Sequence, residues 1–221
     1  MDQISPPARG RLLYLMRILE SAGDEPLTSA QIEGLTGWSS NTIRKDISCL
    51  GGDTWDKVPR EAHDKAHGHG MGSCSGYAPA ALVPAIRKAL ELDRRRKFCV
   101  VGLGRLGSAY LNFRDSELGE FDLAAGFDTN VNRVEILSSP APLYPAYKMA
   151  EVITRFGIEM ALLCVPAEAA QTAAEKLVTA GIRGILNFAP VALKVPPAIA
   201  VRNVFVADEL RSLAINMQSS I

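Results

Sequence analysis

The pattern of apolar and polar positions divides the chain into a helical front part and a back part in which strands and helices alternate. Over residues 8–50, apolar side chains recur at helical spacing, which predicts three helices with breaks at Gly23–Pro26 and at Gly37. Thr28 and Gln31 have the spacing of a capping box for the second helix, and Ser39 or Ser40 can cap the third. Three short helices in this order favour a helix-turn-helix.

Residues 51–78 have no apolar periodicity and contain six glycines and all three histidines. They predict a loop or an extended hairpin, which in a helix-turn-helix domain could serve as a wing. Residues 79–92 return to helical spacing, and the charged run 93–97 marks the boundary with the back part.

From Phe98 onward, apolar runs rich in β-branched residues alternate with helical stretches. We expect strands at 98–104, 123–128, 159–166, 184–190 and 200–206, with a helix between the third and the fourth. This alternation is typical of a parallel sheet with helices on its faces.

Composition and charge exclude some classes of protein without selecting one. The 221 residues are 48% hydrophobic and 22% charged, with a formal net charge of zero, which suits a globular protein. Charge therefore gives no argument for nucleic-acid binding. No run reaches the roughly 20 apolar residues of a membrane span, the N-terminus lacks a signal-peptide core, and the four cysteines are not closely paired. We expect a cytoplasmic protein.

A glycine-rich turn is the strongest chemical motif. Gly102, Gly104 and Gly107 have the G-x-G-x-x-G spacing, follow a strand and begin a helix. In such a turn the backbone can come close to a pyrophosphate, and the N-terminus of the helix points toward the negative charge of the phosphates. Asp128 ends the next strand, at about the interval of the acid that binds ribose hydroxyls and repels a 2′-phosphate. These features predict a site for NADH or NAD⁺.

One interpretation of this site is a small NAD-dependent oxidoreductase with an N-terminal dimerisation domain. Such an enzyme needs a general acid or base beside the nicotinamide. No histidine follows His69, and the residues after Asp128 are needed to complete the sheet. We therefore expect a protein that is not an enzyme, with no catalytic residues and no metal.

The other interpretation is a DNA-binding regulator, and it rests on the third helix. In SNTIRKDISCL (40–50), Ile43, Ile47 and Leu50 share one face. The opposite face is polar and cationic, and its side chains are Asn41, Arg44, Lys45 and Ser48. Such side chains can reach base edges and phosphates, and Thr42 could contact a phosphate. An ordinary solvated helix can carry the same pattern.

Together these motifs resemble the Rex family of redox-sensing transcriptional repressors. The resemblance extends from Ile4 to about Ala214 and is carried by NTIRKDIS (41–48), VVGLGRLGSA (100–109), GFD (126–128), VPAEAAQ (165–171) and AGIRGILNFAP (180–190). It implies an α/β protein with a winged-helix DNA-binding domain at 1–92, a Rossmann doubly wound parallel sheet at 93–206 and a C-terminal dimerisation helix, exchanged between subunits, at 207–221. It also implies a homodimer that binds double-stranded operator DNA when NAD⁺ is bound and releases it when NADH binds.

The resemblance also assigns site residues. The pyrophosphate would be held by Gly102, Leu103, Gly104, Arg105, Leu106 and Gly107, and the ribose by Asp128. The nicotinamide end would lie near Val165, Pro166, Asn187, Phe188, Ala189 and Pro190. Arg44 and Lys45 match cations of the family's recognition helix, and Arg17 matches an arginine of its switching network.

Two features depart from the family's pattern. Where the family has a tyrosine and an aspartate that pair across the dimer, this chain has Phe113 and Phe205. Two phenyl rings cannot form that hydrogen bond, although they can pack together, and Arg17 then lacks its expected carboxylate. We therefore expect weaker discrimination between NADH and NAD⁺, or a switch that uses other residues.

The second departure is a wing that is longer than the family's by roughly 17 residues. It contains three basic and four acidic residues: Lys57, Arg60, Lys65, Asp53, Asp56, Glu61 and Asp64. The acidic residues offset the basic ones, so contact between this wing and DNA is left open. His63, His67, His69 and Cys74 lack the spacing of a structural metal site, and a polar loop is favoured over metal binding.

Overall fold

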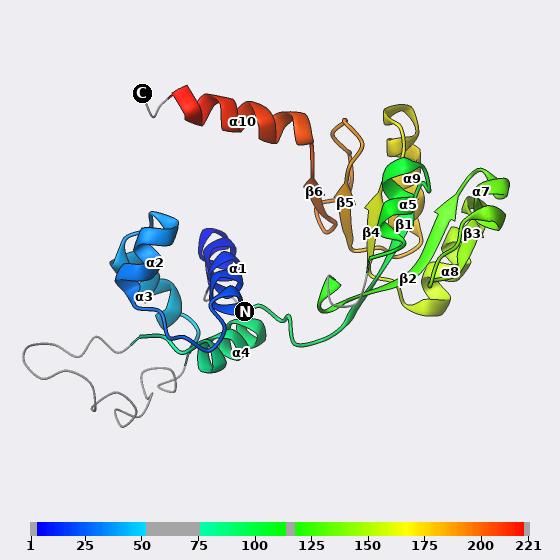
Figure 1. Cartoon of the computed structure of the whole chain (residues 1–221). Helices are drawn as coiled ribbons and strands as arrows, with labels where there is room; N and C mark the ends of the chain where they lie inside the picture. Colours follow the sequence, from blue (N-terminus) through cyan, green and yellow to red (C-terminus); the bar gives the residue numbers. More distant parts are fainter. Residues whose placement is uncertain (1–3, 52–75, 114–117, 219–221) are drawn as a thin grey trace, which may run out of the picture. The chain divides into compact units, whose positions relative to one another are not determined.

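The computed structural model describes residues 4–51, 76–113 and 118–218 (Figure 1). These residues form two compact units, Met1–Arg94 and Arg95–Ile221, each with its own hydrophobic core. Within them, no helix is long and apolar enough to cross a membrane.

The first unit is a bundle of short helices. Its helices are α1 (Pro6–Ser21), α2 (Ser29–Thr36), α3 (Ser40–Ser48) and α4 (Pro79–Ala89). Thr28 and Gln31 form the expected capping box, Gly37 ends α2 in the left-handed conformation, and Ser39 caps α3. Every helix contributes to the core, whose fully buried side chains are Leu12, Leu19, Ile32, Ile43, Ile47, Leu82 and Ile86.

Tyr77, near the end of the segment expected to form a wing, lies beside the turn that precedes α2. Leu27 and Tyr77 form an antiparallel bridge, in which the Tyr77 N–H donates to the Leu27 carbonyl at 2.8 Å and the reverse bond measures 3.1 Å. Residues 52–75 of the expected wing lie outside the described residues, and they include its basic residues and the candidate metal ligands His63, His67, His69 and Cys74.

The second unit is built on one sheet of parallel strands. The strands are β1 (Arg96–Val101), β2 (Phe121–Asp128), β3 (Leu143–Pro145), β4 (Met160–Leu163), β5 (Gly184–Asn187) and β6 (Ala200–Asn203). Their order is β3-β2-β1-β4-β5-β6, with every pair parallel, which is the order of a Rossmann fold. The predicted doubly wound sheet is confirmed. β3 has only three residues and was not predicted, because so short a run shows no periodicity.

Helices follow most strands of this sheet. They are α5 (Arg105–Tyr110), α7 (Val131–Ile136), η1 (Ala146–Lys148), α8 (Met149–Phe156), α9 (Ala167–Thr179) and α10 (Val206–Gln218). Alternate residues of β1 and β4 enter two different cores, because side chains alternate across a strand. Val101 and Leu163 pack with residues of α8 and α9, whereas Phe98 and Val100 pack with Leu103 and Leu111 around α5.

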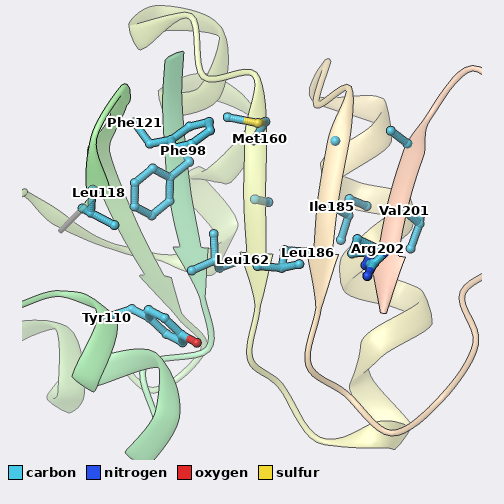
Figure 2. A pocket seen from close by; sticks show the side chains of 13 residues that line it. Phe98, Tyr110, Leu118, Phe121, Met160, Leu162, Ile185, Leu186, Val201 and Arg202 are labelled. Atoms are coloured by element: carbon cyan, nitrogen blue, oxygen red, sulfur yellow. The ribbon is translucent and has the colours of Figure 1, made fainter. Parts of the chain in front are cut away.

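The face of the sheet that carries Phe98 contains an apolar hollow of about 460 Å³ (Figure 2). It is lined by residues of β1, β4, β5 and β6 together with Tyr110, Leu118 and Phe121. Among the described residues that line it, Arg202 is the single charged one.

Candidate functional site

The glycine-rich turn follows β1 and passes close to the end of β4. Gly102 has φ of 89°, and a Cβ atom there would lie 2.5 Å from the Cys164 carbonyl oxygen. A Cβ atom on Gly107 would lie 1.8 Å from the Gly102 carbonyl oxygen. Gly104 differs, because a Cβ atom there would meet no atom within 4 Å. The protein's own packing therefore requires the first and third glycines, while the second borders open space into which a ligand can approach.

Three backbone N–H groups at the start of α5 have no acceptor in the part of the chain that the structure describes. Gly102 N–H donates to the Phe127 carbonyl at 2.8 Å, and Leu103 N–H donates to Asp128 Oδ2 at 2.7 Å. Within the described residues, the N–H groups of Gly104, Arg105 and Leu106 have no such partner. Unpaired N–H groups in the first turn of a helix are donors suited to phosphate oxygens, so these residues fit a pyrophosphate.

The carboxylate of Asp128 forms hydrogen bonds within the protein, including one with the glycine-rich turn. Besides Leu103 N–H, its carboxylate accepts from Asn130 N–H at 2.7 Å, and Arg133 Nη1 lies 3.4 Å from Oδ2. The side chain is only 4% exposed. β2 lies beside β1, so its last residue ends next to the turn that follows β1. A direct contact between Asp128 and ribose hydroxyls stays a prediction.

The two segments expected at the nicotinamide end lie side by side, because β4 and β5 are neighbours. Phe188 N–H donates to the Leu163 carbonyl at 3.0 Å, which joins the segment after β5 to β4. Val165 and Phe188 are half-buried, and Pro166 and Pro190 are exposed.

Asn187 is held by hydrogen bonds within the protein, and its place near the nicotinamide end stays a prediction. Its side chain is fully buried, and its amide donates to the Val191 carbonyl at 2.8 Å and to Asn203 Oδ1 at 2.9 Å. Its Oδ1 accepts from Ala189 N–H at 3.0 Å. These bonds hold the loop after β5, which includes Phe188, in a fixed shape.

Two residues near this end were missed by sequence reasoning. The ring of Tyr110 lies 5.3 Å from that of Phe188 and 4.9 Å from that of Phe113. Burial raises the pKa of the Cys164 thiol to about 12, and burial, followed by repulsion from the Cys164 thiolate, raises the pKa of Tyr110. Both groups are neutral near pH 7. Tyr110 lies nearly two helical turns after Gly104, and counting these turns along the sequence would have placed it in the helix that begins at the glycine-rich turn.

The outer face of α3 has the predicted arrangement. Asn41, Arg44, Lys45 and Ser48 are exposed, while Ile43 and Ile47 are buried. The Thr42 hydroxyl pairs with that of Ser39 at 2.9 Å, and Ser48 Oγ donates to the Lys45 carbonyl at 2.7 Å.

A buried acid on the inner face of α3 was not predicted. Asp46 is 5% exposed and accepts two hydrogen bonds from Arg11 of α1, at 2.6 Å from Nε and 2.8 Å from Nη2. This pairing raises the pKa of the Arg11 guanidinium. Glu33 of α2 in addition accepts from Ser40 N–H at 3.1 Å. Together these bonds fix α3 against α1 and α2.

The expected switch residues fall in both units. Arg17 is exposed on α1, Phe113 follows α5 and is 41% exposed, and Phe205 is half-buried before α10. A contact between Phe113 and Phe205 of two subunits stays a prediction. The described residues include no group of three His, Cys, Asp or Glu side chains able to hold a metal ion.

A family model described as a CoA binding domain matches residues 93–191. Among curated proteins, the redox-sensing transcriptional repressor Rex 1 of Enterococcus faecalis is 31% identical over 96% of this chain and 92% of its own length. Rex of Rhodopirellula baltica is 32% identical over 98% and 86%, and Rex of Latilactobacillus sakei is 35% identical over 89% and 86%.

Solved structures give the same result. The crystal structure of RSP, a Rex-family repressor, aligns with a TM-score of 0.80 at 27% identity, covering 100% of this chain and 97% of that one. RSP in complex with β-NADH aligns at 0.79 and 25% identity, and RSP with β-NAD⁺ and operator DNA at 0.79 and 26%. The relatives are named as repressors and not as enzymes, which favours the regulator over the oxidoreductase. The chain belongs to the Rex family of redox-sensing transcriptional repressors.

Proposed function

We propose that this protein is a transcriptional repressor that binds operator DNA through α3 and releases it when NADH occupies the site at the glycine-rich turn. NAD⁺ permits DNA binding. The observation that carries the proposal is that one chain combines a nucleotide turn with open space at Gly104 and a helix with a cationic outer face. The nucleotide then acts as a signal and not as a reactant.

At the nucleotide site, the N–H groups of Gly104, Arg105 and Leu106 hold the pyrophosphate, and Asp128 keeps the turn in shape. Val165 and the loop from Phe188 to Pro190 border the nicotinamide. The bound dinucleotide supplies a ring that is positively charged when oxidised and neutral when reduced. The family match to RSP, whose structures were solved with each nucleotide, supports this assignment.

At the DNA face, Arg44 and Lys45 supply cations for phosphates or guanine edges, and Asn41 supplies an amide for base edges. Arg11 and Asp46 keep the helix at a fixed angle in its domain. A repressor of this kind acts on chromosomal DNA, so the proposal implies a cytoplasmic protein.

A homodimer is supported by the surface of α10. Val206, Leu210, Leu213 and Met217 recur at spacings of four, three and four residues, and each is between 56% and 67% exposed. Such spacing places the four side chains on one stripe of the helix. A second copy that receives this helix would remove the stripe from water, which fits an exchanged C-terminal helix.

The proposal is tested by selecting duplexes from a random library with NAD⁺ present and measuring the binding of the selected duplex by fluorescence anisotropy. NADH is expected to weaken DNA binding at least fivefold, while NAD⁺ does not. DNA affinity that is the same with and without NADH would contradict the proposal.

A further inference from the structure

Tyr110 lies between Phe113 and Phe188, and Phe188 belongs to the loop proposed to border the nicotinamide. Tyr110 is the last residue of α5, the helix that begins at the glycine-rich turn. Its ring contacts Phe188 on one side, with 42° between the ring planes, and meets Phe113 edge-on at 67° on the other. The three rings form a continuous chain of contacts, which we call the aromatic cluster.

One end of the aromatic cluster is held firmly. Phe188 is fixed to β4 through its N–H bond to the Leu163 carbonyl, and the buried Asn187 amide shapes the loop around it. The other end is accessible, since Phe113 is 41% exposed. Rings packed at these distances do not move independently, because a displacement of one creates a clash or a void at the next. A change at the inner end is thus transmitted to the surface.

Tyr110 also carries a hydroxyl group for which no described residue provides a hydrogen bond. Its side chain is half-buried, and its hydroxyl has no hydrogen-bond partner within the described residues. Figure 2 shows the Tyr110 ring at one end of the hollow, apart from the rings of Phe98 and Phe121. A half-buried hydroxyl without a partner is costly unless a ligand or water satisfies it.

We propose that Tyr110 is a positioning residue that binds the nicotinamide end of the bound nucleotide with its hydroxyl and transmits the occupancy of the site through its ring to Phe113. This inference rests on the proposed function. It also explains how DNA binding can respond to NADH in a chain that has phenylalanine at position 113, where the family has a tyrosine.

Two substitutions separate the hydroxyl from the ring. Tyr110→Phe keeps the ring and removes the hydroxyl, and Tyr110→Leu removes both. Tyr147→Leu is the matched control, because Tyr147 is 78% exposed on η1. For each variant we would measure NADH affinity by calorimetry and the coupling factor, which is the ratio of duplex Kd with saturating NADH to that without nucleotide.

Tyr110→Phe is expected to weaken NADH binding about 3- to 10-fold, the equivalent of one hydrogen bond, and to keep the coupling factor. Tyr110→Leu is expected to bring the coupling factor to within about twofold of one, while DNA binding without nucleotide and the control variant are unchanged. If Tyr110→Leu does not fold, the NADH affinity of Tyr110→Phe still decides, since an unchanged affinity would contradict a hydrogen bond from the hydroxyl to the nucleotide.

The unsubstituted chain distinguishes the two ways of failing. If NADH does not change the DNA affinity of the unsubstituted chain, the proposed function is contradicted. A responsive chain whose Tyr110→Leu variant responds equally contradicts only the role given to Tyr110.

Discussion

The carboxylate of Asp128 accepts a hydrogen bond from the backbone N–H of Leu103 at 2.7 Å, and so ties the end of β2 to the glycine-rich turn. Asp128 binds a second N–H, that of Asn130, with its other oxygen. A buried carboxylate with two such donors fixes the turn before any ligand arrives. The acid at this position thus acts on the nucleotide site through the shape of the turn.

Asp128→Asn is expected to distort the turn, because one amide N–H₂ must then face a backbone N–H donor. The expected cost is about 1–3 kcal/mol in the free energy of unfolding, together with weaker NADH binding. Urea unfolding and calorimetry measure the two effects. Asp122→Asn is the control, since Asp122 pairs with Arg95 at the surface and its loss should cost at most about 1 kcal/mol. Equal effects of both substitutions would contradict this role.

Gly104→Val is expected to abolish NADH binding without loss of stability. The backbone at Gly104 is extended, and a side chain there meets no protein atom within 4 Å, so it fills only the space left for the nucleotide. DNA binding should persist and no longer respond to NADH. Gly107→Val is the contrasting variant, because its Cβ atom clashes with the Gly102 carbonyl and should prevent stable folding. Tight NADH binding by Gly104→Val would overturn the proposed location of the pyrophosphate.

Arg44→Ala is expected to weaken DNA binding without changing the melting temperature, because Arg44 is exposed on the outer face of α3. If it contacts a phosphate, the slope of log K against log salt should fall by about one. Anisotropy titrations at several salt concentrations measure this slope. The NADH affinity serves as the internal control and should be unaffected. Unchanged DNA affinity would show that this face does not contact the duplex.

Arg11→Ala is expected to destabilise the first unit, because it leaves the buried Asp46 carboxylate without its cation. The expected loss is about 3 kcal/mol, at the low end for a broken buried pair because Arg11 is partly exposed. Thermal unfolding followed by circular dichroism measures it, and Arg44→Ala is the matched control on the same domain. A melting temperature equal to that of the control would contradict the structural role of this pair.

The buried thiol of Cys99 predicts a loss of stability in alkali. Burial raises its pKa from 9.0 to about 12 in the folded protein. Between these values the unfolded chain releases a proton that the folded chain keeps, so stability falls as pH rises, by at most about 1.4 kcal/mol per pH unit. Urea unfolding at pH 8 and pH 10 should show a shallower decline for Cys99→Ala than for the unsubstituted chain. Parallel declines would contradict the assignment.

The sequence predicted those parts of the fold whose signal is local. The capping pair of Thr28 and Gln31 and the apolar face of the third helix are properties of short stretches, and the structure has both. The glycine-rich turn was also predictable, because its spacing reflects steric limits at Gly102 and Gly107.

The features that sequence reasoning missed depend on contacts between distant residues. Arg11 and Asp46 are 35 positions apart, and no local pattern links them. The hydrogen bond between Asn187 and Asn203, which lie on neighbouring strands, likewise follows from no local pattern. Tyr110 was not recognised because its contact with Phe188 forms only in the folded unit, where the end of α5 lies beside the loop that follows β5.

The most direct test of the account is reciprocity between the two ligands. NADH affinity would be measured by calorimetry with and without saturating selected duplex, and duplex affinity by anisotropy with and without saturating NADH. If the nucleotide is a signal, each ligand must weaken the other by the same factor, and we predict equal factors of at least five. An NADH affinity that does not change when the duplex is bound would contradict the account.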